Sequence, residues 1–199
     1  MSSATVHAHV AAWVGGTPVP IAEVDAQLDR LRAGPHAGLL PVADSAEGRQ
    51  LRRWATQVVV TRHLLELESA ARGLAPAHRV EAVVPDRAAA MELGGIVANV
   101  LAHSPPAQTV FAEVTRSVHA TAEDVASYYS RNGDEFADST GRPQPLENVA
   151  GDIARSLTSS LRRRCFVDWL DRRRAALVRL EPGYEHPGDP HQPDATHRH

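Results

Sequence analysis

The first part of the chain alternates short apolar runs with turn signals. Val10–Val14 is an apolar run with the length of a strand, Gly15–Pro18 is a turn sequence, and Val19–Ile21 is a second extended piece. This order predicts a small hairpin. In Ala22–Arg32 apolar positions recur at steps of three and four, which predicts a helix. A Gly-Pro pair follows, so residues 33–44 are expected to form a loop.

Two long segments have the apolar periodicity of helices. The first, Ala46–Arg72, has apolar positions at steps of three and four, and Gly73 follows as a stop signal. The second, Leu146–Ala176, repeats every four residues at Val149, Ile153, Leu157, Leu161, Cys165 and Trp169. Because a helix turns every 3.6 residues or so, a step of four drifts by about 40°, and the buried face is expected to rotate. Ala176–Leu180 is predicted to close the domain as a strand.

Shorter elements are predicted between the two long helices. Val80–Val84 is a candidate strand. Asp86 is a candidate N-cap for a helix that runs to about His103, although Gly94-Gly95 interrupts it. Ser104-Pro105 has the form of an N-cap and a first helical position, which predicts another helix.

A further short helix is predicted after an extended segment, Val118–Ala120. Thr121 and Asp124 have the spacing of a capping box, with Asp in the place where Glu is preferred. Asn132-Gly133 ends this helix. Residues 137–145 have no periodicity and are predicted to form a short loop.

The composition fits one helical domain, residues 1–181, and a flexible His/Pro-rich tail, residues 182–199. A net charge of −3 argues against a nucleic-acid-binding surface. All 21 basic residues are Arg, a pattern typical of a GC-rich genome. The absence of Lys from the sequence excludes a Schiff-base lysine and a phosphate-loop lysine.

Neither export nor membrane insertion is expected. Met1–Val14 lacks the basic start and the apolar core of a signal peptide. No apolar run reaches the length of a membrane span. Cys165 is the only cysteine, which excludes an internal disulfide and Cys-rich zinc sites. Together these observations predict a soluble, cytoplasmic protein.

Three sequence segments occur in a characteristic order. The first is Val10–Ile21. The second is the tyrosine-bearing segment Asp124–Asn132, which continues into Glu135-Phe136, and the third is the closing helix and strand at Leu146–Leu180. In this order they resemble the parvulin-type foldases and their SurA-like chaperone relatives. The resemblance implies a mainly α, SurA/trigger-factor-like helical domain with a small β element in which the N-terminal and C-terminal strands pair.

The chain departs from that family at the catalytic isomerase domain. In the family this domain lies between the second and third of these segments, whereas here only residues 137–145 separate Phe136 from Leu146. Nine residues form a loop and not a domain. The resemblance therefore implies a chaperone-like protein that binds a protein or peptide client without isomerising proline bonds. A second copy of the chain, in a homodimer, is a further partner that stays open at this point.

Aromatic side chains are the candidates for a peptide-binding surface, because peptide grooves are often lined by them. The candidates are Trp13, Tyr128, Tyr129 and Phe136. Tyr128 and Tyr129 are adjacent and point about 100° apart on a helix, so both cannot face fully inward. The alternative for each aromatic residue is a place in the core, which is preferred for Trp54 and Trp169 on the helix stripes.

The histidine-rich tail is a candidate metal site, because imidazole binds zinc, nickel, cobalt and copper. The candidate ligands are His186, His191, His197 and His199, with Asp189 and Asp194 as oxygen donors. His7 and His9 repeat the spacing at the other end of the chain and join the site if the termini meet. The alternative is a solvated tail, because ordering a Pro/Gly-rich segment costs entropy. A metal-handling accessory protein that uses Zn or Ni is the second functional hypothesis.

An enzyme is the third hypothesis, and the motifs do not support it. The chain has no Gly-x-Ser-x-Gly and no His-Glu-x-x-His motif. Cys165 lies on the apolar step of a long helix, where a buried, inert thiol is expected. The runs Arg162–Arg164 and Arg172–Arg174 spread round that helix and are interpreted as a solvated, ion-paired surface.

Overall fold

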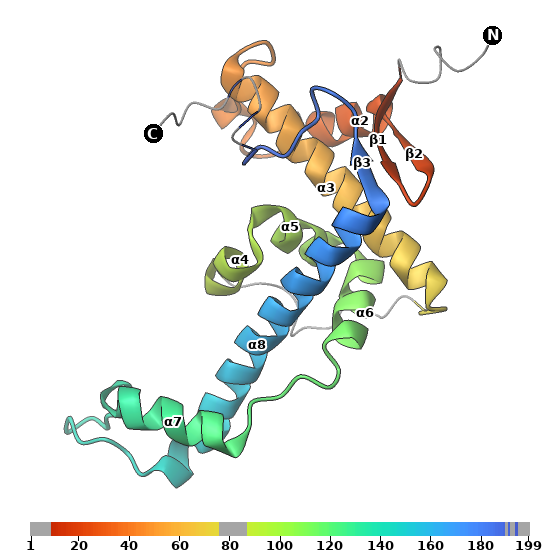
Figure 1. The fold of residues 1–199 in the computed structure, drawn as a ribbon. Coiled ribbons are helices and arrows are strands. Elements are labelled where there is room, and N and C mark those ends of the chain that lie inside the picture. Colours follow the sequence, from red (N-terminus) through yellow and green to blue (C-terminus); the bar gives the residue numbers. More distant parts are fainter. Residues whose placement is uncertain (1–8, 76–86, 190, 192–193, 195–199) are drawn as a thin grey trace.

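The computed structural model describes residues 9–75, 87–189, 191 and 194. Within these residues the chain forms seven α-helices and one three-stranded sheet, which confirms the predicted mainly α fold class. The predicted strand Val80–Val84 and the predicted N-cap Asp86 lie outside the described residues. Figure 1 shows a body, from which residues 121–157 project; we call this projection the arm.

The sheet joins the two ends of the domain. Strand β1 (Val10–Val14) lies between β2 (Thr17–Pro20) and β3 (Val178–Leu180) and is antiparallel to both. Gly15-Gly16 connects β1 to β2 with φ angles of 57° and 85°. A two-residue hairpin turn of this kind needs positive φ at both positions, which explains the glycine pair. The predicted hairpin and the predicted pairing of the first and last strands are confirmed.

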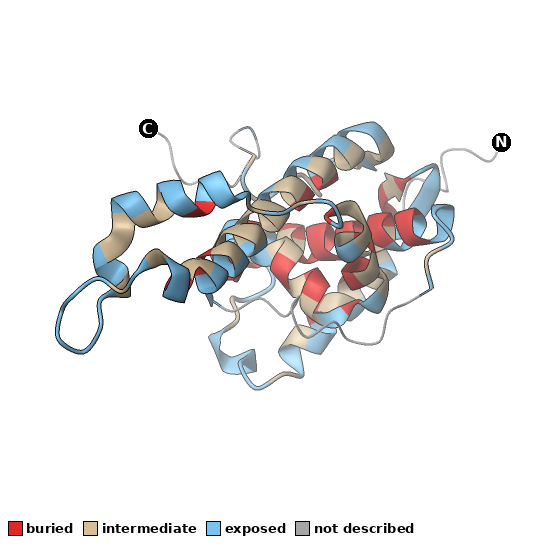
Figure 2. Ribbon diagram, turned by 90° about the horizontal axis from the view of Figure 1, so that it is seen from below, coloured by how far each residue is buried: buried red, intermediate tan, exposed pale blue. Residues whose placement is uncertain are grey.

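Helix α3 (Ala46–Ala71) is the centre of the body. Its consecutive residues Val58–Val60 are all buried, and because they point about 100° apart the helix is covered on most sides. Figure 2 shows the buried residues concentrated in this region. The cover comes from the sheet and from α2 (Ile21–Arg32), α5 (Gly95–His103), α6 (Pro105–Val114) and α8 (Leu146–Leu177). The predicted loop between α2 and α3 contains one 3-10 turn, Ala37–Leu39.

The short helices before α6 differ in one respect from the prediction. Helix α4 (Arg87–Leu93) and α5 are separate helices, because Gly94 has a φ of 76° that no α-helix accommodates. The predicted interruption is therefore a complete break. Helix α6 begins as predicted: Ser104 is its N-cap, and the Ser104 hydroxyl accepts a hydrogen bond from the backbone N–H of Ala107.

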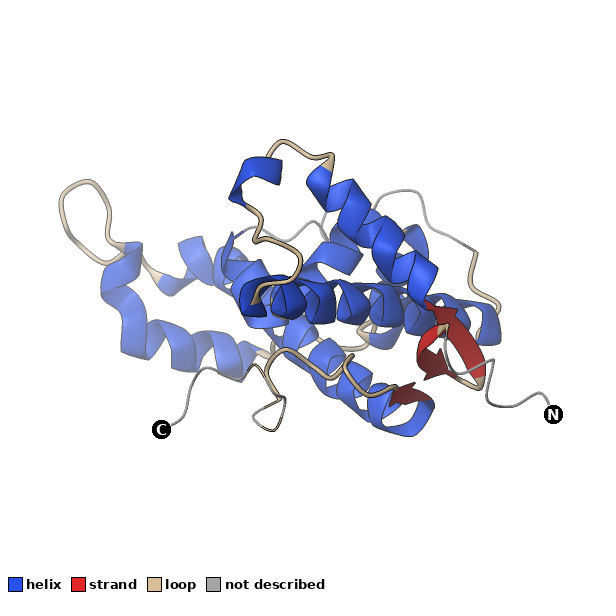
Figure 3. Cartoon of the chain, turned by 90° about the horizontal axis from the view of Figure 1, so that it is seen from above, coloured by secondary structure: helices blue, strands red, loops and turns tan. Residues whose placement is uncertain are grey.

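The arm is built on the first half of α8, a helix of 32 residues and thus about 48 Å long. Helix α7 (Ala122–Asn132) begins with the predicted capping box: Thr121 N donates to Asp124 Oδ2 at 2.8 Å, and Asp124 N donates to Thr121 Oγ1 at 3.1 Å. A 3-10 turn, Gly133–Phe136, and the loop 137–145 lead into α8 (Figure 3). The two helices of the arm share a small core of Val125, Val149 and Ile153.

The connection from α6 to α7 contains Val118–Ala120, which was predicted to be extended and lies outside all the described helices. No described strand lies beside it, and side chains of α8 bond its backbone instead. Thr158 Oγ1 accepts from Ala120 N at 3.0 Å, and Arg162 Nε donates to Val118 O at 3.1 Å. The connection is therefore fixed along the surface of α8.

The buried face of α8 rotates along the helix, as predicted. Cys165 and Trp169, which continue the step of four, are only half-buried. The residues that are fully buried are Val149 and Ile153 in the arm, and Phe166 and Leu170 in the body. The helix runs to Leu177, so β3 is shorter than the predicted strand Ala176–Leu180.

Candidate functional site

Three of the four predicted peptide-binding residues lie together in the arm. The ring centroids of Tyr128 and Tyr129 lie 6.2 and 6.3 Å from that of Phe136. The Tyr128 hydroxyl donates to Glu135 Oε2 at 2.9 Å, a bond that raises the pKa of this phenol. The Tyr129 hydroxyl donates to the backbone oxygen of Gln144. These side chains are half-buried and tie the loop to α7, and contact with a client stays a prediction for them.

Trp13 is not brought to the same place. It lies on β1, near the opposite end of α8 from the arm. Its Nε1–H donates to Glu181 Oε1 at 2.8 Å, and the Arg179 guanidinium lies 5.3 Å from the ring centroid. Trp13 therefore connects β1 to the residues at the end of β3.

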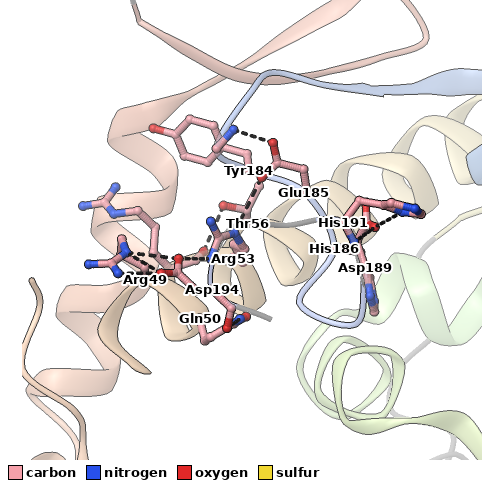
Figure 4. Close-up of polar contacts among 12 residues, drawn as sticks. Arg49, Gln50, Arg53, Thr56, Tyr184, Glu185, His186, Asp189, His191 and Asp194 are labelled. Carbon is pink, nitrogen blue, oxygen red and sulfur yellow. Dashed lines mark hydrogen bonds and ion pairs between the residues drawn. The ribbon is translucent and has the colours of Figure 1, made fainter. Parts of the chain in front are cut away.

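The described part of the C-terminal segment, residues 181–189, 191 and 194, lies along α3 (Figure 4). Arg53, which is 4% exposed, donates from Nη1 to Asp194 Oδ2 at 2.7 Å. Arg49 donates to the same carboxylate from Nη2 at 2.5 Å and from Nε at 3.0 Å. Gln57 Nε2 donates to Tyr184 O at 3.1 Å. Side chains of α3 thus hold this segment at several points, while the domain boundary at residue 181 stays a prediction.

The contacts of Asp194 with Arg49 and Arg53, which we call the Asp194 clamp, predict that the stability of the fold depends on pH. Hydrogen bonds from Arg49 and Arg53 hold the pKa of Asp194 well below its ordinary value. A depressed carboxyl pKa stabilises the folded state above the unfolded-state pKa, about 4, and this stabilisation is lost as the pH falls through the folded-state pKa. We expect Asp194→Asn to lower the melting temperature at pH 7, and the difference from wild type to vanish at pH values well below 4.

The measurement is thermal unfolding of both proteins over this pH range. Asp29→Asn, an exposed position on α2, is the matched control and should follow the wild-type curve. A difference between wild type and Asp194→Asn that is the same at all pH values contradicts the clamp.

The predicted metal ligands fall on both described and undescribed residues. His191 Nδ1 lies 3.2 Å from Asp189 Oδ1, and His186 lies closer to the body. His197 and His199 are outside the described residues, as is His7. In the ranges that the structure describes, no three His, Cys, Asp or Glu side chains converge as metal ligands. The metal hypothesis stays a prediction.

A cleft of about 530 Å³ opens between α3, the junction of α4 and α5, α8 and the C-terminal segment. This volume lies in the usual range of ligand sites, about 300–1,000 Å³. Its polar lining is Asp171, Arg174 and His186. Its apolar lining is Trp54, Leu93, Ile96, Val97, Val167 and Leu170.

Arg174 is the more buried of the two charged residues that line this cleft, Asp171 being exposed. Its Nη1 donates to Thr61 Oγ1 at 3.1 Å, and its Nη2 donates to Gln57 Oε1. Burial lowers the pKa of Arg174, and the nearby Asp171 carboxylate acts in the opposite direction. A guanidinium stays charged at pH 7 under such shifts, so the cleft contains a half-buried cation.

His186 is the neutral polar group of the cleft. Burial lowers its pKa, and the charge of Arg174 acts in the same direction. The backbone N–H of Gly188 donates to His186 Nδ1 at 3.0 Å. The proton of the neutral ring therefore resides on Nε2.

The predictions from sequence did not identify the cleft, because its lining comes from four distant parts of the chain. Trp54 was assigned to the core, but it is half-buried and also lines the cleft. The run Arg172–Arg174 was interpreted as a solvated, ion-paired surface. Arg172 is solvated and Arg173 is ion-paired, but the interpretation does not hold for Arg174. Arg173 Nε donates to the buried Glu68 Oε1 at 2.6 Å, and Arg174 turns inward. Consecutive helical residues point about 100° apart, so one run meets three environments.

A family model matches the N-terminal part of the chain. It is described as a family of unknown function (DUF7158), and the match covers residues 10–47, which include β1, β2 and α2. No curated protein and no solved structure matches the chain. None of the helices that the structure describes combines the length and the apolar composition of a membrane span.

Proposed function

We propose that this protein is a non-enzymatic, chaperone-like protein that binds a segment of a protein or peptide client in the cleft. The observation that carries the proposal is the cleft itself, with about 530 Å³ of volume, apolar walls and a cation at one side. Apolar walls with a few polar groups suit an extended chain that inserts apolar side chains and is oriented by its polar atoms.

The resemblance to the parvulin-type scaffold supports this proposal. The pairing of β1 with β3 closes the two ends of the scaffold in one sheet. The loop 137–145 takes the place that the isomerase domain has in that family. Since nine residues do not form a catalytic domain, the protein binds its client without isomerising it.

The test is suppression of the aggregation of reduced insulin, used as a model client. Val97→Arg places a charge in the apolar wall of the cleft and is expected to abolish most of the suppression. Met91→Arg changes a residue of α4 that is 79% exposed and does not line the cleft, so it should act like wild type. Thermal unfolding verifies that both variants fold, and Ile96→Gln is a milder second change in the same wall.

Two outcomes overturn the proposal. If wild type, Val97→Arg and Ile96→Gln suppress aggregation equally, the client does not bind in the cleft. Prolyl isomerase activity of the wild-type protein on a test peptide contradicts the non-enzymatic part.

A further inference from the structure

Arg174 differs from its neighbour on α8 in its partners. Arg173 meets the carboxylate of Glu68, whereas both partners of Arg174 are neutral oxygen atoms, those of Thr61 and Gln57. Among the described residues Arg174 forms no ion pair. Its side chain is half-buried and also lines the cleft, so the structure presents, at the edge of an apolar space, a cation whose hydrogen-bond partners are all neutral. The Asp171 carboxylate is near enough to act on the charge of Arg174 but forms no ion pair with it.

Such a cation favours an anionic ligand. A half-buried charge loses part of its hydration, and only hydrogen bonds or an opposite charge compensate the free-energy cost of this loss. A guanidinium matches the two oxygen atoms of a carboxylate, and charge-assisted hydrogen bonds of this type are about twice as strong as neutral ones. The apolar wall beside Arg174 then requires that the group attached to the carboxylate is apolar.

The start of α5 adds to this preference. Gly94 and the first turn of α5 line the cleft, and no side chain caps this helix. Its uncapped N-terminus therefore contributes positive potential to the lining of the cleft. A Cβ added at Gly94 or Gly95 would meet no atom within 4 Å, so there is free space beside the backbone at these two residues.

Asp171 restricts the charge and the type of the ligand. It lines the same cleft as Arg174, and His186 is neutral, so the three polar side chains carry no net charge. This balance favours one carboxylate over a multiply charged group such as a phosphate. The Asp171 carboxylate is also an acceptor, which an amide N–H next to the ligand carboxylate can satisfy. A peptide has an amide N–H in that place, and a fatty acid does not.

We propose that the cleft binds the free C-terminal end of an apolar peptide, with the terminal carboxylate on Arg174, the last amide N–H on Asp171 and the last side chain against the apolar wall. This inference rests on the proposed function for the nature of the client. It adds that the client is recognised by its chain end.

The experiment is fluorescence anisotropy with the full-length protein and a short fluorescein-labelled peptide that ends in leucine. The free acid is expected to bind at least about tenfold more tightly than the same peptide with a C-terminal amide, as for hydrogen bonds to charged groups. Arg174→Gln, which keeps polar contact with Thr61 and Gln57, should bind the acid and the amide equally. Arg172→Gln, an exposed neighbour, should keep the wild-type preference.

The outcomes separate this inference from the proposed function. Equal binding of acid and amide by the wild-type protein overturns recognition of the chain end but leaves client binding intact, and this comparison needs no variant. Competition by decanoate as strong as by the unlabelled peptide acid overturns the role of the amide N–H. Absence of binding by either peptide, together with no suppression of insulin aggregation, overturns both proposals.

Discussion

Replacement of Phe166 by alanine is expected to lower the free energy of unfolding by about 4 kcal/mol, the usual loss for a large buried aromatic side chain. Phe166 has no exposed surface and lies between two other rings, with centroid distances of 5.0 Å to Phe111 and 5.5 Å to Trp169. It thus joins α6 to the body half of α8. The substitution removes both ring contacts and leaves a cavity that this helix pair cannot close. Urea denaturation followed by circular dichroism measures the loss.

Phe136→Ala is the matched control for this prediction. Phe136 is half-buried in the arm, where it contacts Tyr128 and Tyr129 but not the core of the body. We expect a loss of only about 1–2 kcal/mol, since less apolar area leaves water when the ring is half-buried. If Phe166→Ala and Phe136→Ala have equal effects, the assignment of the main core to the body is wrong.

The second large effect is expected from alanine at Gly48. This residue lies in the first turn of α3, and a Cβ there would be 2.5 Å from the backbone oxygen of Ala43 and closer still to that of Val42. Backbone atoms cannot move aside as a side-chain end does. Gly48→Ala is therefore expected to destabilise the protein by about 3 kcal/mol, the upper part of the usual range for overpacking.

Gly151→Ala is the opposite case and the control. Gly151 is an exposed residue inside α8, and its added Cβ would meet only the end of the Arg155 side chain, at 3.7 Å. Alanine is favoured over glycine in a helix by about 1 kcal/mol, so this variant should be more stable than wild type. Melting curves of the two variants are expected to shift in opposite directions. A shift in the same direction contradicts the tight packing of Val42 and Ala43 on α3.

Local pattern was sufficient for most elements of the fold. The glycine pair at residues 15 and 16, the capping box at Thr121 and the N-cap at Ser104 each act through residues within a few positions along the chain. Their structures could therefore be predicted from sequence. The partners of the backbone at Val118 and Ala120 could not be predicted in this way, because Arg162 and Thr158 lie 44 and 38 residues further along the chain.

The candidate site depends on long-range packing, and for this reason the sequence did not reveal it. Arg174 is one of three consecutive arginines, and only the position of α3 and α5 around α8 decides which of them turns inward. The same holds for Asp194, whose partners on α3 lie 145 and 141 residues earlier. The tyrosine pair was visible in the sequence, yet its hydrogen bonds to Glu135 and Gln144 were not.

The position of β1 in the middle of the sheet has a consequence for biosynthesis. Its first partner, β2, leaves the ribosome directly after it, but its second partner, β3, is the last of the strands that the structure describes. During translation one edge of β1 therefore stays without its hydrogen-bonding partner until residues 178–180 have been made. Open strand edges promote aggregation. The nascent protein is thus itself exposed to misassociation until β3 has been made, because the sheet is complete only then.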